Sequence, residues 1–515
     1  MSDKLKTEMK MKLKMFACVA VSSVVSFAVE TNSWYFAKDI PAGGFPQRAR
    51  WDVNHKFDIP ENGHATFDFM CSNIEPCLHF TLHARKGSNW ISYSFTPDIV
   101  SGEKKTIVIA RKDWCLKELP NGKLDDWKGF DGLRFSIWRA VDKAFSVKCS
   151  VENFTVHSEP APAVPKRIAA KLPPRKGERR LAWCHRAWGM SDKSSWDYTI
   201  RRLKKSGFTD IIPNMCRPGG AYYESKVLPV MPYVKEHGDQ LESCLKACRK
   251  YGVKCHVWKV SWYIGKPGGC VDGFVEKMRE AGRLAIDTDG KDIRWMCPSH
   301  PENRKAEIDA MLELAAKGVD GIHFDFIRYR WMNMCYCNTC KGEFEKKYGA
   351  VPSWPKSVML DGDCQRLSDW QKKHVQFRCD NITAVVREVS KKVRKEYPDV
   401  AISAAVLKRG GETDKASMAQ DWGLWCREGY LDFVCPMSYE SSLPFFKRCI
   451  ERERENAAGV KCYPGIGYSV MRPRRDKPAM LAEQVQALRD AGFEGFAVFD
   501  YTPVTATALY NMFKE

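Results

Sequence analysis

Residues 318–330 read GVDGIHFDFIRYR, a segment whose two faces differ in a way that indicates the fold. Alternate residues of a β-strand face opposite sides of its sheet. Ile322 and Phe324 therefore lie on one face, which suits packing against helices, and His323 and Asp325 lie on the other. A strand that carries polar residues on its second face is typical of a closed barrel, whose interior receives that face. The segment therefore predicts a barrel strand with its polar residues inside.

From residue 180 onward, strand-like and helix-like segments alternate along the chain. Eight strands with helices between them, over 180–515, predict an α/β fold of the (β/α)8 TIM-barrel type. The alternative is an open doubly wound sheet, but the Gly-rich phosphate loop of such sheets does not follow the first strand. The expected strands are 180–189, 209–217, 254–263, 319–329, 400–407, 431–440, 460–470 and 495–501. The expected helices are 195–207, 239–252, 301–318, 369–397, 421–428, 442–459 and 478–492.

The chain before the barrel follows a different pattern. Residues 29–157 contain six or more short alternating segments separated by turns, which predicts an all-β sandwich domain. The clearest segments are 64–71, 77–84, 90–95, 105–110, 133–140 and 145–156. This accessory domain is either a carbohydrate-binding module or a purely structural unit. Residues 158–179 are rich in Pro, Ala and basic residues, and they form a semi-rigid linker between the two domains.

The N-terminus and the charge bear on location and partners. Residues 1–28 begin with basic residues, continue with a short apolar run and end with small residues at the expected cleavage site. This is the pattern of a signal peptide. We therefore expect a secreted, periplasmic or cell-surface protein, without a membrane span because no later apolar run is long enough. The net charge of +19 is spread along the chain without a nucleic-acid-binding motif. A solvated surface or an acidic glycan partner explains it better than nucleic acid does.

Barrel enzymes place their chemistry at the carboxyl ends of the strands, so polar residues there are the site candidates. A buried, unpaired carboxylate is costly, which predicts that Asp325 meets a substrate or partner; an ion pair with Arg328 is the structural alternative. For His323, one layer deeper, a core role and a site role are both open. The candidate substrate-binding residues are His185, Asn214, Arg217, His256, Lys259, Trp262, His323, Arg328, Tyr329, Tyr439 and Asp500.

Several segments share a resemblance to one family. VDGIHFDFIRY at 319–329 resembles the strand-four motif of the family-10-like glycosyl hydrolases, a group with TIM barrels. The resemblance covers most of the barrel half, since KCHVWKVSWY at 254–263, MCPSHPENR at 296–304 and MAQDWGLWCREGYLDFVCPMSY at 418–439 are also similar to family segments. It implies a glycosidase that acts on an extracellular or cell-wall polysaccharide.

The motif match implies a role for three residues. It makes Asp325 the catalytic carboxylate and gives Arg328 and Tyr329 site-shaping roles. Arg330 departs from the pattern, because the family commonly has Pro at that position.

Glycoside hydrolysis needs a second carboxyl group on the other side of the scissile bond. With Asp325 as nucleophile or base, the partner acid is expected to be Glu440, then Asp421, then Asp500. Asp421 opens the segment after the fifth strand and suits a helix cap equally well. No cofactor is expected for catalysis. The alternative function is a non-catalytic glycan-binding protein on the same barrel; a metal-dependent deacetylase is disfavoured because the barrel half lacks an H-x3-H pair.

A cysteine cluster follows the fourth strand. Cys335, Cys337 and Cys340 have C-x-C-x2-C spacing and can bind a structural zinc ion if a fourth ligand joins them. Cys297, Cys364 or a histidine are the candidates for that ligand. A disulfide plus a free thiol is the alternative. A catalytic metal is disfavoured, because soft thiolates suit closed structural sites.

Overall fold

The computed structural model describes residues 32–513 apart from short stretches. The expected signal peptide at 1–28 lies outside the described residues. No helix in the described part of the chain has the length and apolar character needed to cross a membrane. The stretches left out between residues 32 and 513 are 41–47, 75–76, 96–100, 117–118, 120–121, 140–143, 164–167, 333, 361–366, 409 and 472–475.

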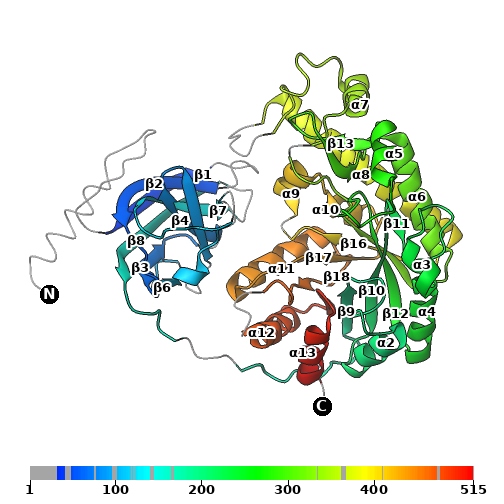
Figure 1. The fold of residues 1–515 in the computed structure, drawn as a ribbon, viewed down its shortest axis with the longest axis horizontal. Coiled ribbons are helices and arrows are strands. Elements are labelled where there is room, and N and C mark those ends of the chain that lie inside the picture. Colours follow the sequence, from blue (N-terminus) through cyan, green and yellow to red (C-terminus); the bar gives the residue numbers. More distant parts are fainter. Residues whose placement is uncertain are drawn as a thin grey trace, which may run out of the picture.

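The N-terminal part is a sandwich of two antiparallel sheets, as expected from the sequence (Figure 1). Aromatic side chains fill the space between the sheets; the rings of Phe69 and Phe80, one from each sheet, lie 4.6 Å apart. The first sheet has the order β1 (Trp34–Ile40), β8 (Phe145–His157), β3 (His64–Cys71) and β6 (Lys104–Ala110). The second has the order β2 (Arg48–Phe57), β7 (Phe130–Arg139), β4 (Cys77–Lys86) and β5 (Asn89–Phe95).

From Arg179 onward, parallel strands form a closed ring, which confirms the TIM barrel and shows that the open-sheet alternative is wrong. The seventh strand is split in two: its first half pairs with the sixth strand and its second half with the eighth, which in turn pairs with the first. In ring order the strands are β9 (Arg179–Cys184), β10 (Asp210–Arg217), β12 (Lys254–Val260), β15 (Gly321–Asp325), β16 (Ala401–Val406), β17 (Phe433–Pro436), β18 (Lys461–Cys462) with β19 (Gly465–Ile466), and β20 (Gly495–Val498).

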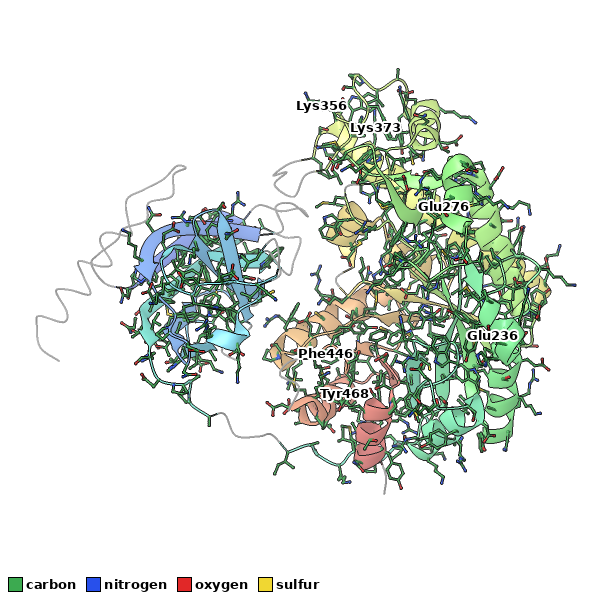
Figure 2. The ribbon with its side chains drawn as sticks, viewed as in Figure 1. Glu236, Glu276, Lys356, Lys373, Phe446 and Tyr468 are labelled. Carbon is green, nitrogen blue, oxygen red and sulfur yellow. The ribbon has the colours of Figure 1, made fainter. Side chains whose placement is uncertain are left out.

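Helices surround the ring, and their exposed faces carry charged side chains such as Glu236 and Glu276 (Figure 2). Each expected helix is present: α2 (Trp196–Lys205), α4 (Gln240–Tyr251), α6 (Pro301–Ala315), α8 (Asp369–Glu396), α10 (Trp422–Arg427), α11 (Leu443–Ala457) and α12 (Lys477–Asp490). Shorter elements come in addition: α3 (Pro232–His237), α5 (Phe274–Glu280), α7 (Asn338–Tyr348), α9 (Gly411–Met418), α13 (Pro503–Phe513), β11 (Gly220–Ala221), and a hairpin of β13 (Leu284–Ile286) and β14 (Asp292–Met296).

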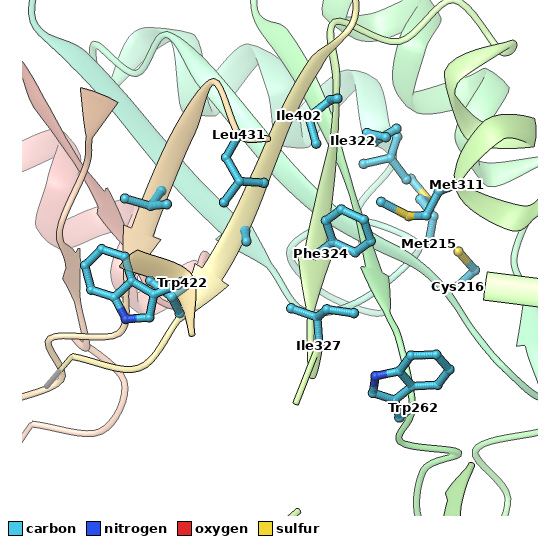
Figure 3. Close-up of a cluster of buried hydrophobic side chains, with 14 of the residues drawn as sticks. Met215, Cys216, Trp262, Met311, Ile322, Phe324, Ile327, Ile402, Trp422 and Leu431 are labelled. Carbon is cyan, nitrogen blue, oxygen red and sulfur yellow. The ribbon is translucent and has the colours of Figure 1, made fainter. Parts of the chain in front are cut away.

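The barrel strands separate two cores. Ile322 and Phe324 of β15 belong to the core between strands and helices, together with Met311 of α6 (Figure 3). The other core fills the barrel and includes Trp183 and Trp258. The predicted orientation of the 318–330 segment is therefore confirmed, since its apolar parity faces the helices and its polar parity faces the interior.

Candidate active site

The lowest interior layer is an ion-paired network at the amino ends of the strands. Asp210 accepts a hydrogen bond from His256 Nε2 at 3.0 Å and forms an ion pair with Arg179. Burial acts to raise the pKa of Asp210, but the His256 and Arg179 hydrogen bonds outweigh it and lower this pKa to about 2. Gly321 leaves room for the imidazole, because a Cβ there would lie 2.2 Å from His256 Nδ1. The structure thus places His256 at the base of the barrel, away from the carboxyl ends where a substrate was expected to bind.

The middle layer is a chain of hydrogen bonds across the interior. The Trp183 indole N–H lies 3.1 Å from His323 Nε2, and His323 Nδ1 lies 2.9 Å from Ser403 Oγ. Burial lowers the pKa of His323 to about 3, so the ring is neutral at physiological pH. Both ring nitrogens have partners inside the protein. Of the two roles left open by the sequence, the geometry favours the core role for His323.

Asp325 forms the upper layer, at the last residue of β15. The residue is 5% exposed, and Oδ1 accepts hydrogen bonds from the Phe326 N–H at 2.6 Å and from Arg328 Nη1 at 3.4 Å. Burial raises the pKa of Asp325, and Arg328 only partly opposes this. Phe326 has φ of +52°, in the left-handed region that bulky residues rarely adopt. Strain of this kind is concentrated at functional sites.

Aromatic rings surround the upper layer. Tyr439, after β17, stacks on Phe499, after β20, with ring centroids 5.2 Å apart, and both residues are partly exposed. Trp183 contacts both rings from below. His185 is exposed just beyond β9 and lies edge-on to Trp258, 5.5 Å away. Of these residues, sequence reasoning had found Tyr439 and His185 and had missed the other three; the inward parity of Trp183 and Trp258 was the available signal.

Three buried donors at this end of the barrel have no hydrogen-bond partner in the part of the chain that the structure describes. They are Asn214 Nδ2, Arg217 Nε and Trp258 Nε1. Asn214 is paired in register with Trp258. The Arg217 guanidinium lies against Gly265 and is close enough to His185 to lower the pKa of that histidine. Buried donors normally have partners, so these groups are candidate contacts for a ligand.

Asp500 supplies a second carboxylate at the mouth. It follows β20, the eighth strand, which lies opposite the fourth strand, β15, in the ring. Although His185 is exposed at one side, the protein atoms packed around its ring desolvate it and lower its pKa, and the charges of Asp500 and Asp325 both oppose that shift. The pKa of Tyr439 is raised by burial first and then by Asp325 and Asp500. Within the described residues, the Asp500 carboxylate has no hydrogen-bonding or ion-pairing side chain. Both carboxyls lie close enough to His185 and Tyr439 to affect the pKa of each.

The two partner acids that the sequence ranked above Asp500 are already engaged. Glu440 forms an ion pair with Lys408. Asp421 caps α10 by accepting the Leu424 N–H at 3.4 Å, and it lies 3.3 Å from Lys415 Nζ. Asp421 therefore has the helix-cap role that the sequence had left open beside a catalytic one.

Lys259 and Trp262 lie on the helix side of β12, so the structure does not bring them to the mouth. Lys259 forms a buried ion pair with Glu307 of α6. Both Lys259 and Trp262 line a cavity of about 410 Å³ between β12, α5 and α6, and Asp325 does not contribute to it. The sequence placed these residues at a strand end correctly but gave no weight to their outward parity.

Tyr329 also lies outside the barrel. Its ring is fully buried, and its hydroxyl lies 3.3 Å from Ser299 Oγ and 3.4 Å from Asn381 Nδ2. It supports the segment after Asp325 from behind. Next to it, Cys335, Cys337 and Cys340 gather with Cys297. Cys364 lies outside the described residues.

Fold and site together define a barrel scaffold of the glycoside hydrolase type, with carboxylates and aromatic rings at the carboxyl ends of its strands. A family model described as Glycosyl hydrolase-like 10 matches residues 179–464, which is more than half of the chain. The chain belongs to the glycosyl hydrolase-like 10 family, and the resemblance seen in the sequence is confirmed. The comparison with curated proteins gives no match.

Solved structures of glycosidases are also similar to this chain. α-L-Fucosidase isoenzyme 2 from Paenibacillus thiaminolyticus has 15% identity and a TM-score of 0.46, over 65% of this chain and 48% of that one. β-Galactosidase from Bacillus circulans sp. alkalophilus has 14% identity and a TM-score of 0.44, over 63% and 50%. β-Galactosidase from the psychrophilic Marinomonas ef1 has 13% identity and a TM-score of 0.47, over 62% and 54%. The chain spans about half the length of these proteins.

Proposed function

We propose that the chain is an exported glycoside hydrolase that cleaves an O-glycosidic bond of an extracellular or cell-wall polysaccharide. One observation carries this proposal: the buried carboxyl of Asp325 and the carboxyl of Asp500 follow opposite strands at the same end of the barrel, both near His185 and Tyr439. Glycoside hydrolysis requires two such groups, one on each side of the scissile bond.

The two carboxyls differ in environment, which gives each a role. Burial raises the pKa of Asp325, so this group is suited to hold a proton and donate it to the leaving-group oxygen. Asp500 is partly exposed and has no cationic partner among the described side chains, so it is suited to attack the sugar or activate water. This differs from the sequence-based expectation of Asp325 as nucleophile or base, because burial favours its protonated form.

The surroundings of the carboxyls suit a sugar. Tyr439 and Phe499 are partly exposed aromatic residues, whose rings are suited to pack on the apolar faces of pyranose rings. Asn214 and Arg217 offer unpaired donors for sugar hydroxyls. The net charge of +19 is the reason to include acidic glycans among the substrates. The N-terminal sandwich would serve as an accessory carbohydrate-binding domain.

Release of reducing ends from a panel of neutral and acidic glycans tests this proposal. The wild type is expected to cleave at least one glycan, and Asp325→Asn and Asp500→Asn are each expected to reduce the rate by about 100-fold or more. Asp421→Asn is the matched control, because it makes the same charge change and asparagine still caps a helix. Glu440→Gln tests the other candidate for the second catalytic carboxyl. If this variant loses activity while Asp500→Asn keeps it, Glu440 is the second carboxyl and not Asp500.

The competing function has a distinct outcome in the same experiment. Binding of a glycan by the wild type, with no release of reducing ends from any member of the panel, would make the chain a non-catalytic glycan-binding protein. Export is tested separately, by N-terminal sequencing of the product secreted from a host with an export pathway. A mature N-terminus close to Val29 is expected.

A further inference from the structure

Four buried cysteines come together beside the strand that ends in Asp325. Cys297 follows β14 and precedes α6, Cys335 and Cys337 lie in the segment after β15, and Cys340 lies in the first turn of α7. Their four sulfur atoms all lie within 4.8 Å of one another, and all four residues are buried. The chain therefore brings thiols from two distant segments to one point.

The spacing of the sulfurs fits a metal site rather than a disulfide. Cys297 Sγ lies 3.6 Å from Cys337 Sγ and 3.6 Å from Cys340 Sγ. A disulfide requires about 2.05 Å between sulfurs. Four sulfurs placed tetrahedrally at the usual Zn–S bond length of about 2.3 Å are about 3.8 Å apart. The two separations from Cys297 are close to that tetrahedral edge, and the other sulfur pairs lie within 4.8 Å.

Hydrogen-bonding groups lie around the sulfurs, as they do around the ligands of protein metal sites. The Ile286 N–H points to Cys335 Sγ and the Cys340 N–H to Cys337 Sγ, each at 3.4 Å. Ser299 Oγ lies 3.2 Å from Cys340 Sγ and accepts a hydrogen bond from Asn381 Nδ2. Such contacts stabilise thiolate charge and fix the orientation of metal ligands.

We propose that Cys297, Cys335, Cys337 and Cys340 bind one structural zinc ion. Four protein ligands complete a tetrahedral shell and leave no position open for water or substrate, so the ion has no part in bond cleavage. Its role is to join the segment after β15 to the segment before α6. Ser299 links this site to the hydroxyl of Tyr329, four residues beyond Asp325, so the zinc supports the segment that carries the proposed acid.

A second cysteine cluster provides a matched control. Cys244 and Cys248 of α4 and Cys255 of β12 are also buried, with their sulfurs within 4.8 Å of one another. This cluster has three thiols, one fewer than a closed structural zinc site requires. Substitution of this cluster therefore shows whether zinc binds specifically at the four-cysteine site or nonspecifically to any group of buried thiols.

Metal analysis of the full chain, purified under reducing conditions with zinc supplied, tests the proposal. One zinc per chain is expected in the wild type and in Cys248→Ser, and none in Cys297→Ser or Cys337→Ser. A wild type without zinc, or zinc lost in Cys248→Ser but kept in Cys297→Ser, would overturn the proposal. So would disulfides among the four cysteines found by peptide mapping.

Cobalt substitution of the wild type covers the case in which the Cys297 and Cys337 variants do not fold. Cobalt bound by four thiolates in a tetrahedron has intense visible absorption, and one equivalent is expected to produce it and to be displaced by one equivalent of zinc. Weak absorption typical of oxygen ligands would contradict a four-cysteine site. These readouts do not depend on glycosidase activity, so they stand or fall separately from the proposed function.

Discussion

Trp183 and His323 are joined by a hydrogen bond of 3.1 Å across the barrel interior. Because an indole nitrogen only donates, His323 Nε2 accepts, and the ring proton is on Nδ1, which donates to Ser403 Oγ. Ser403 Oγ in turn lies 3.2 Å from the carbonyl of Ile322 as a donor. The chain of donors and acceptors is complete, so this layer forms a fixed floor below Asp325.

Loss of the Trp183–His323 hydrogen bond is expected to lower the unfolding free energy. His323→Leu leaves the buried Trp183 N–H without an acceptor, at about 1–3 kcal/mol of unfolding free energy, and Trp183→Phe removes the other partner. Because each substitution disrupts the same bond, the double variant is expected to lose less than the two single losses added together. Urea unfolding of the four proteins measures this coupling, and strictly additive losses would show that the two side chains do not interact.

The buried Glu453 of α11 is expected to make the folded protein less stable as the pH rises toward 8. It is fully buried, accepts a hydrogen bond from Ser438 Oγ at 2.7 Å, and has a pKa raised by burial to about 8. Between pH 4.5 and about 8, the folded chain holds a proton that the unfolded chain lacks. Unfolding free energy is therefore expected to fall by about 1.4 kcal/mol per pH unit across this range.

Glu453→Gln removes that pH dependence. Denaturant unfolding at pH 5 and pH 8 is expected to show a shallower decline in the variant than in the wild type. Glu451→Gln, an exposed position of the same helix, is the control and should keep the wild-type slope. Equal slopes in all three proteins would mean that Glu453 is ionised in the folded chain at neutral pH.

Loss of the Lys259–Glu307 ion pair is expected to lower the unfolding free energy and to leave the KM for a glycan unchanged. Both side chains are almost fully buried, so Glu307→Gln leaves an uncompensated ammonium and is expected to cost about 3–5 kcal/mol. The pair Lys259→Met with Glu307→Leu should recover much of this loss. Asp309→Asn, in an exposed pair with Lys305, should cost under about 0.5 kcal/mol. A higher KM for a glycan at unchanged stability in Glu307→Gln would place Lys259 in the substrate site instead.

Asp325 is expected to lower the stability of the folded protein at neutral pH. Its pKa is raised in the folded chain, so ionisation opposes folding as pH rises above 3.8. Asp325→Asn is therefore expected to unfold at higher denaturant than the wild type at pH 7, with the difference shrinking as pH falls. A variant less stable than the wild type at pH 7 would support the structural ion pair with Arg328 over a site role.

Much of the fold could be predicted from the sequence because its signals are local. The apolar parity of each barrel strand and the caps of the helices are short-range patterns, and the strands and helices between Arg179 and Val498 follow them. β1 and β2 were not predicted, and both are edge strands. β2 nevertheless alternates regularly, since Ala49, Trp51 and Val53 face inward with exposed polar residues between them, so its signal was present in the sequence and was overlooked.

The site was only partly predictable, because its geometry depends on contacts between distant residues. Parity within β15 placed Asp325 correctly, and the same test applied to β12 would have selected Trp258 over Lys259. Strand position alone could not show that Lys408 pairs with Glu440, the contact that leads us to propose Asp500 as the second carboxyl. Cys297 is 38 residues from Cys335 in the sequence, and only the fold brings their sulfurs together.

The dependence of rate on the leaving group tests the assignment of Asp325 and Asp500 most directly. An acid is needed only when the departing oxygen is basic, so Asp325→Asn should lose about 100-fold or more on a natural glycan but little on an aryl glycoside of the same sugar with an acidic phenol. Asp500→Asn should lose activity on both substrates. An equal loss on both substrates in Asp325→Asn, or full activity of either variant on the natural glycan, would contradict the assignment.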